Sequence, residues 1–314
     1  MKSPTILDAI GNTPIVELTH VVPAGSARIL VKIEWANPTG SMKDRMARSM
    51  VQGAVDAGRL LPGGTVVEYT AGTTGVSLAL VCAALGYRLE IVTSDAFSEE
   101  KRNTIRAFGA VVTEVPSDNK RITEELIKRM IETSRAISDR PGHWWADQLN
   151  NEDGITGYHA LGDEIWTQTG GNVDAFVQSV GTAHSIHGVA ESLRARGLRL
   201  HVAAVEPAES AVLSGGSSGS HKIEGIGIGF IPPLWRPHEV DEIITVTTED
   251  AKAMTRRLAR EEGLFAGTSC GANVVAALEV AKRLGPHATV VTLMVDTGIK
   301  YLSTDLYAPV KGRD

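Results

Sequence analysis

The alternation of short apolar runs with helix-like segments is the feature that most constrains the fold of this chain. Before residue 139, the predicted elements are strand 65–70, helix 77–86, strand 88–94, helix 98–109, strand 110–115 and helix 121–138. After residue 172, they are strands 173–180, 200–207, 242–247 and 289–295 and helices 185–196, 248–262 and 271–284. This alternation is typical of βαβ units in mostly parallel sheets with right-handed crossovers. The loop-rich stretch 139–153 separates the two blocks, and a Gly- and Ser-rich stretch, 214–233, interrupts the second.

Composition excludes several classes of protein. The net charge of −6 argues against a nucleic-acid binder, which normally has a basic face. We expect no membrane span, because no apolar stretch approaches the roughly 20 residues required. The N-terminal segment lacks the apolar core of a signal peptide, so we expect a cytoplasmic protein. Cys82 and Cys270 have neither disulfide nor zinc spacing, and His184 and His187 lack a third ligand nearby, so we expect no metal.

The segment Asn37–Arg45 (NPTGSMKDR) places a lysine at a predicted helix start. Asn-Pro-Thr-Gly is a turn signal, Ser41 can cap the following helix, and Lys43 falls in its first turn. The positive end of the helix dipole lowers the pKa of a lysine there modestly, which favours an amine that attacks an aldehyde. Taken alone, the pattern favours a solvated surface lysine.

Two strand-to-helix junctions are suited to binding an anion. In Thr70–Gly75 (TAGTTG), small residues let backbone N–H groups converge on a carboxylate or phosphate, and threonine hydroxyls add donors. That pattern is about as typical of an ordinary tight turn. In Val180–Gly188 (VGTAHSIHG), Gly181, Thr182 and Ser185 can hold a phosphate at a helix N-terminus. This second loop is neither a Walker A loop nor a dinucleotide fingerprint.

A third junction, Ala266–Asn273 (AGTSCGAN), carries Ser269, which can hydrogen-bond at a helix start. Cys270 beside it is interpreted as a small packing residue rather than a thiol of low pKa. We place all three junctions at the carboxyl ends of strands, where ligands bind in open α/β sheets. A phosphorylated aldehyde cofactor and a carboxylate substrate would use all of these features, which reverses the interpretation of Lys43.

Together the motifs resemble the cysteine synthase (O-acetylserine sulfhydrylase) and cystathionine β-synthase family, which are fold type II, tryptophan synthase β-type, pyridoxal-phosphate (PLP) enzymes. The resemblance runs from GNTPIVEL (11–18) to YLST (301–304). It implies an α/β fold of two lobes, each a mostly parallel twisted sheet flanked by helices, with the active site in the cleft between them. The implied larger domain, residues 1–42 and 147–314, binds the PLP phosphate. The smaller domain, residues 43–146, binds the substrate carboxylate.

The resemblance also implies roles for single residues. Lys43 is the implied catalytic residue and Schiff-base lysine. The implied cofactor-binding residues are Lys43, Thr73, Gly181, Thr182, Ala183, His184, Ser185, Gly225 and Ser269. The implied substrate-carboxylate residues are Thr70, Ala71, Gly72, Thr73, Thr74 and Gln148. Ser269 would bond the pyridine nitrogen, and a neutral partner there suits β-elimination to an aminoacrylate, to which a nucleophile such as sulfide adds.

Two loops depart from the family pattern. The family's asparagine and serine in TSGNTG are Thr73 and Ala71 here. Two glycines of its phosphate loop, usually GTGGT, are Ala183 and His184, so we expect the backbone donors to survive only if φ is negative there. The His184 side chain either adds a donor to the phosphate or points to solvent. These changes leave the identity of the amino-acid donor open.

The implied function is β-replacement on an activated serine such as O-acetylserine, in cysteine biosynthesis, by a homodimer with serine acetyltransferase as a candidate partner. Other β-substitutions, as in cystathionine synthesis, stay open. Dehydratases usually have Arg-Gly after the lysine, whereas Asp44-Arg45 follows here. Use of O-phosphoserine would call for an arginine near residues 214–224, and none is there. A PLP-binding regulatory partner with little activity is the alternative from another class, and the intact lysine disfavours it.

Overall fold

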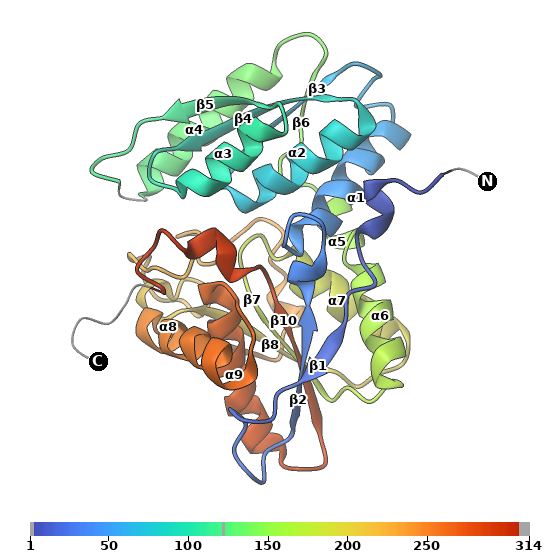
Figure 1. Cartoon of the computed structure of the whole chain (residues 1–314), viewed down its shortest axis with the longest axis vertical. Coiled ribbons are helices and arrows are strands. Elements are labelled where there is room, and N and C mark those ends of the chain that lie inside the picture. The colour runs from blue at the N-terminus through green and yellow to red at the C-terminus, as the bar shows by residue number, and fades with distance from the viewer. Residues whose placement is uncertain (1–2, 121–122, 308–314) are drawn as a thin grey trace.

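The computed structural model describes residues 3–120 and 123–307, which form two α/β lobes stacked along the long axis of the molecule (Figure 1). The larger lobe contains a six-stranded sheet. Its strands, in spatial order, are β1 (Ile15–Glu17), β2 (Arg28–Ile33), β10 (Thr289–Met294), β7 (Ala175–Ser179), β8 (His201–Pro207) and β9 (Glu242–Val246). Only the β1–β2 pair is antiparallel. The predicted fold class is therefore confirmed.

Helices cover both faces of the larger sheet. Figure 1 shows α6 (His159–Thr169) and α7 (His184–Ala195) on one side and α8 (Thr248–Arg257) and α9 (Thr268–Leu284) on the other. Every residue of β7 and β10 is buried. Strands covered on both faces are expected to be continuously apolar, which explains why their sequences lack the alternation of a half-exposed strand.

The smaller lobe contains a four-stranded parallel sheet. Its strands, in spatial order, are β5 (Val111–Val115), β4 (Arg88–Ser94), β3 (Thr65–Tyr69) and β6 (His143–Trp145). In Figure 1, α2 (Thr73–Leu85) and α3 (Glu99–Ala107) cover one face, and α4 (Glu124–Ser138) covers the other. The Ser98 side chain caps α3, as predicted, by accepting a hydrogen bond from the backbone N–H of Lys101.

The structure corrects several predicted elements. Strand β6 lies inside the stretch 139–153 that was predicted to be loop, and it pairs only with β3, far away in the sequence. Helix α2 begins four residues before the predicted position 77, because its first turn is the Thr70–Gly75 loop itself. The predicted helix 248–262 ends its regular part at Arg257 and continues as a π-helical turn, Leu258–Glu262. The first two positions of predicted helix 121–138 lie outside the described residues.

Four further elements were not predicted from the sequence. These are β1, β2, α6 and the short helix α5 (Asp153–Thr156). Strand β2 is buried along five of its six residues but contains Lys32, which interrupts its apolar run. Within residues 3–120 and 123–307, no helix has the length and apolarity needed to cross a membrane.

Helix α1 (Lys43–Asp56) begins between the two lobes, with Lys43 as its first residue. A buried ionic cluster fixes this end of the helix, because the Arg45 guanidinium pairs with Glu34 and Glu164, each at 2.8 Å. Lys32 joins the cluster through Glu164 at 2.7 Å. Buried charges are tolerated when each is paired and hydrogen-bonded in this way. The cluster therefore ties the start of α1 to the larger lobe.

Candidate active site

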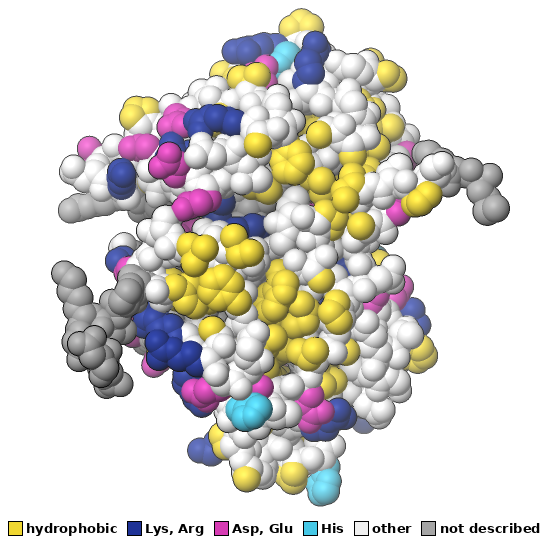
Figure 2. Space-filling view, viewed as in Figure 1, with side chains coloured by type: hydrophobic (Ala, Val, Ile, Leu, Met, Phe, Trp, Pro, Cys, Tyr) yellow, Lys and Arg dark blue, Asp and Glu magenta, His cyan; other side chains and the backbone are white. Residues whose placement is uncertain are grey.

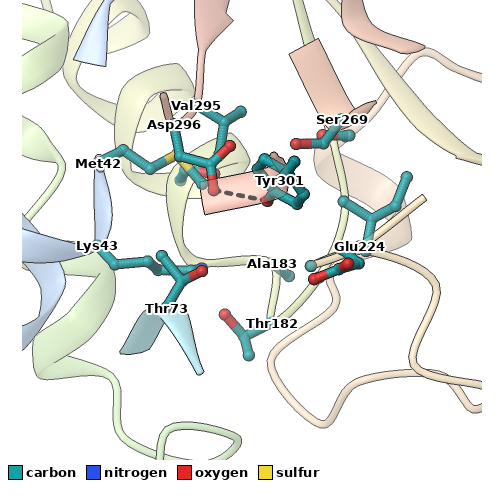
Figure 3. Close-up of a pocket in the computed structure, with 15 residues that line it drawn as sticks. Met42, Lys43, Thr73, Thr182, Ala183, Glu224, Ser269, Val295, Asp296 and Tyr301 are labelled. Atoms are coloured by element: carbon teal, nitrogen blue, oxygen red, sulfur yellow. Dashed lines mark hydrogen bonds between the residues drawn. The ribbon is translucent and has the colours of Figure 1, made fainter. Parts of the chain in front are cut away.

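A pocket brings Lys43 together with segments of both lobes (Figure 3). Residues from the α1 start, the α2 start, the loop after β7, the 224–226 segment, the α9 start and the segment after β10 line it. They are Met42, Lys43, Thr73, Ser179, Gly181, Thr182, Ala183, Ser185, Glu224, Gly225, Ile226, Ser269, Val295, Asp296 and Tyr301. Seven of the predicted cofactor-binding residues besides Lys43 therefore surround the lysine.

Lys43 keeps some accessible surface where it lines the pocket, but the protein otherwise encloses its amine. Burial lowers the pKa of Lys43 to about 8, and the Asp296 carboxylate opposes this shift in part. Burial lowers a lysine pKa because it disfavours the charged form. A substantial fraction of the amine is therefore unprotonated and nucleophilic near neutral pH. The expected shift is present, and its main cause is burial rather than the helix dipole.

The loop after β7 forms one end of the pocket. Gly181 packs so closely against the 224–226 segment that a Cβ on it would lie 2.4 Å from the Gly225 carbonyl oxygen. Ala183 has φ of 69°, a left-handed conformation that costs a non-glycine residue roughly 1–2 kcal/mol. The condition of a negative φ is therefore not met at Ala183, which keeps the turn that a glycine would make and accepts the strain.

His184 follows as the first residue of α7, and its ring does not line the pocket. The ring is 1 % exposed, which rules out the solvent-pointing alternative. Its Nδ1 lies 2.6 Å from the Thr182 hydroxyl, and its Nε2 lies 3.0 Å from the Asn151 carbonyl oxygen. Burial lowers the pKa of His184 to about 3, so the ring is neutral. Both ring nitrogens are thus engaged by the protein.

The third junction lines the pocket through Ser269, in the first turn of α9. We expected this junction to follow a strand directly, and it does not. Instead, Ala266 pairs with Thr297 just beyond the end of β10, which brings the junction to that edge of the sheet. The buried Cys270 sulfur accepts a hydrogen bond from the Val295 N–H at 3.1 Å, and burial raises the pKa of its thiol to about 12. It is a packing residue, as interpreted.

The Thr70–Gly75 loop and Gln148 lie together, as predicted, although only Thr73 lines the pocket. The Thr74 hydroxyl donates to Gln148 Oε1 at 2.8 Å, and Gln148 Nε2 donates to the Tyr69 carbonyl at 2.8 Å. The Thr70 hydroxyl accepts from the Gly72 N–H at 2.9 Å. Gly72 has φ of 129°, so it permits a turn that a residue with a side chain rarely adopts.

Four polar residues of the pocket were missed in the sequence, namely Ser179, Glu224, Asp296 and Tyr301. The Tyr301 hydroxyl donates to Asp296 Oδ2 at 2.7 Å, as Figure 3 shows. Glu224 pairs with Lys101 of α3 at 2.6 Å, and the Lys101 amine also lies 4.7 Å from the centre of the Tyr301 ring. Asp296 directly follows predicted strand 289–295, so the rule that ligands bind at strand carboxyl ends could have identified it. Glu224 adjoins Gly225, which was identified.

No group of three or more His, Cys, Asp or Glu side chains within the described residues is arranged to hold a metal ion. The two histidines in the first turn of α7, His184 and His187, contact different partners. His184 bonds Asn151, whereas His187 Nδ1 lies 3.0 Å from a Glu239 carboxylate oxygen.

Comparisons with known proteins agree with this geometry. The family model described as "Pyridoxal-phosphate dependent enzyme" matches residues 6–296. A cysteine synthase of Staphylococcus aureus is 40 % identical over 306 residues, which cover 96 % of each chain. The solved cysteine synthase of Entamoeba histolytica is 37 % identical with a TM-score of 0.92, covering 100 % of this chain and 95 % of its own. The O-acetylserine dependent cystathionine β-synthase of Helicobacter pylori is 35 % identical with a TM-score of 0.90, covering 98 % and 99 %.

Proposed function

The chain belongs to the family of pyridoxal-phosphate dependent enzymes, and on that premise we propose that it replaces the acetate of O-acetylserine by sulfide and forms cysteine. The observation that carries the proposal is the pocket amine of Lys43, whose pKa is lowered to about 8 and which polar groups from both lobes surround. The cysteine synthase of S. aureus, at 40 % identity over nearly the whole chain, supports the choice of reaction.

The pocket residues fit PLP. Ser179 and Asp296 line the pocket, and within the described part of the chain the buried Ser179 hydroxyl and Asp296 Oδ1 have no hydrogen-bond partner. Buried polar atoms are rarely left in this state, so they favour a polar ligand there. Gly181 lies so close to the Gly225 carbonyl oxygen that the backbone there has no room for a side chain. The Lys43 amine at one end of the pocket can bind the PLP aldehyde, and the anion-type loop at the other end can bind its phosphate.

The residues that would hold PLP follow from their positions. Lys43 would bind its aldehyde, and the N-terminus of α7 with Gly181, Thr182, Ala183, His184 and Ser185 would bind its phosphate. Thr73, Gly225 and Ser269 would contact its ring. When bound, PLP stabilises the negative charge that develops at the substrate Cα.

The chain's own residues would perform the remaining work. The Thr70–Thr74 loop at the α2 N-terminus, with Gln148, would hold the substrate carboxylate. The N–H groups of Ala71, Thr73 and Thr74 would donate to it, because those of Thr70 and Gly72 already donate within the protein. The Lys43 Nζ would accept the proton from Cα, because its pKa of about 8 lies closer to neutral pH than that of an ordinary lysine, which suits a general base. The Cβ–O bond breaks and acetate leaves with its electron pair. Sulfide then bonds to Cβ, and Lys43 returns the proton to Cα.

The assembly that supports this activity is also a proposal. We propose a larger domain of residues 1–42 and 147–314 and a smaller domain of residues 43–146, in line with the two sheets. A homodimer is supported by hydrophobic side chains that gather over the middle of the face in Figure 2, where Figure 1 shows β1 and the helical turn Gly298–Tyr301. Exposed apolar residues in or next to these segments include Val16, Ile299 and Leu302. A molar mass in light scattering of twice the chain mass would support the dimer. We propose a cytoplasmic location from the sequence alone and a serine acetyltransferase partner from the family resemblance.

A spectral titration tests the reaction. O-acetylserine, O-phosphoserine, serine and cysteine are added separately to the PLP-loaded protein while the visible spectrum and acid release are followed. O-acetylserine should change the spectrum with release of acetate, and added sulfide should restore it with formation of cysteine. A response to another amino acid instead would contradict the proposed donor. No spectral change and no acid release with any of the four amino acids would favour a regulatory protein.

A further inference from the structure

Two hydroxyls line the phosphate end of the pocket, Thr182 and Ser185. Both residues are more than nine-tenths buried, and each hydroxyl has one partner inside the protein. A hydroxyl has one proton to donate and lone pairs that accept. The partner inside the protein therefore decides whether each hydroxyl offers the ligand a proton or a lone pair.

The Thr182 hydroxyl has to donate to His184. The Asn151 carbonyl oxygen can only accept, so His184 Nε2, 3.0 Å away, carries the proton of the ring. The ring is neutral, because burial lowers the pKa of His184 to about 3. Nδ1 is then a bare lone pair, and the Thr182 hydroxyl 2.6 Å from it has to supply the proton. Only the lone pairs of Thr182 remain for the pocket.

The Ser185 hydroxyl has the opposite role, which a chain of fixed amides determines. Asn273 Oδ1 accepts from the Ser179 N–H at 2.8 Å, and its Nδ2 donates to the Leu293 carbonyl at 2.9 Å, so its orientation is set. Asn273 Nδ2 also donates to Gln178 Oε1 at 3.0 Å. Gln178 therefore turns its Nε2 to the Ser185 hydroxyl, at 3.2 Å, and that oxygen accepts. The Ser185 proton is left for the pocket.

We propose that these two hydroxyls have fixed and opposite roles toward the cofactor phosphate, with Ser185 donating to it and Thr182 held as an acceptor by His184. The inference rests on the proposed phosphate site and adds to it a function for His184, which is a positioning residue that acts through Thr182. Backbone N–H groups and Ser185 hold the phosphate charge. The phosphate oxygen nearest Thr182 has to carry a proton of its own or bond through a water molecule.

The position of the proton on the His184 ring tests the inference directly. A long-range proton–nitrogen NMR spectrum of the PLP-loaded protein shows which ring nitrogen carries the proton, and His184→Gln identifies the resonance among the nine histidines. We expect a protonated Nε2 and a bare Nδ1 that is unchanged across neutral pH. A protonated Nδ1, or a doubly protonated ring, overturns the inference.

Cofactor affinity provides the second readout, measured by titrating the PLP-free protein. Ser185→Ala should weaken PLP binding by about 10- to 100-fold, as expected for a lost hydrogen bond to a charged group. The matched change Thr182→Val should weaken it by at most about threefold, since Thr182 donates nothing to the phosphate. In a His184→Phe background the Thr182 hydroxyl is free to donate to the phosphate. There, Thr182→Val should weaken PLP binding about ten times more than it does when His184 is present. If His184→Phe does not fold, the ring spectrum and the two single variants still test the inference.

The outcomes separate the inference from the proposed function. Equal losses for Ser185→Ala and Thr182→Val, or the reversed ring proton, contradict the inference alone. PLP binding that neither variant weakens would place the phosphate elsewhere and contradict the proposed site as well.

Discussion

At the scale of single residues, Lys43 is costly to the PLP-free protein for the same reason that makes it reactive. Its pKa of about 8 in the folded chain is below its ordinary value of 10.5, so the folded state disfavours the charged amine. The penalty is fully present below pH 8, falls between pH 8 and 10.5 as the folded-state amine loses its proton first, and vanishes above that range.

Lys43→Met should therefore stabilise the PLP-free protein at pH 7, by up to about 3 kcal/mol from the size of the pKa shift. Denaturant unfolding of both proteins from pH 7 to pH 10.5 measures the difference, which should shrink as the pH rises. A difference that stays constant across this range would show that the amine is not the cause.

Ala183 lies in a strained backbone conformation. Because its φ is 69°, Ala183→Gly should leave stability unchanged or raise it by up to about 1 kcal/mol. The control is Ala136→Gly on the exposed side of α4, which should lower the free energy of unfolding by about 1 kcal/mol. Equal destabilisation by both changes would contradict the strain assigned to Ala183.

At the scale of elements, the α2 helix provides a test of the carboxylate loop at its start. Gly72 has φ of 129°, and a Cβ on it would lie 2.5 Å from Lys101 Cδ. Gly72→Ala should therefore shift the loop and raise KM for O-acetylserine about tenfold or more. Gly86, at the other end of α2, has φ of 77° and open space around it. Gly86→Ala should cost about 1 kcal/mol of stability and leave KM unchanged, which steady-state kinetics with thermal unfolding can check.

The elements that the sequence predicts well are those whose pattern is local. The limits of β4 match the predicted strand 88–94, because a short run that contains the apolar residues Leu89, Ile91 and Val92 is bounded by turn residues. Strand β6 has three residues and exists only because it pairs with β3. A pairing of that kind has no local signature, so β6 could not be predicted from its own residues.

The site divides in the same way. Lys43 and the two anion-type loops are contiguous motifs, and the sequence predicts their place at helix starts. Tyr301 reaches the pocket from the far end of the chain, and the His184 ring depends on a carbonyl of the distant Asn151. These contacts depend on tertiary structure, so residue type alone could not identify them.

At the scale of the whole molecule, one ion pair links the lobes beside the pocket. Lys101 of α3 is 3 % exposed and pairs with Glu224 of the larger lobe, which is partly exposed. Glu224→Gln leaves the buried cation without its carboxylate and should lower the free energy of unfolding by about 1–3 kcal/mol. Glu124→Gln, which removes an exposed pair with Lys128, should change it by less than about 0.5 kcal/mol. Equal effects in denaturant unfolding would mean that the inter-lobe pair is no stronger than a surface pair.

The central claim is that Lys43 binds PLP covalently in a pocket shared by the lobes. Borohydride reduction of the PLP-loaded protein, followed by peptide mass mapping, tests it most directly because reduction makes the lysine–cofactor bond permanent. The account predicts one phosphopyridoxyl group per chain, on the peptide that contains Lys43. A label on any other lysine, or no label, would contradict it.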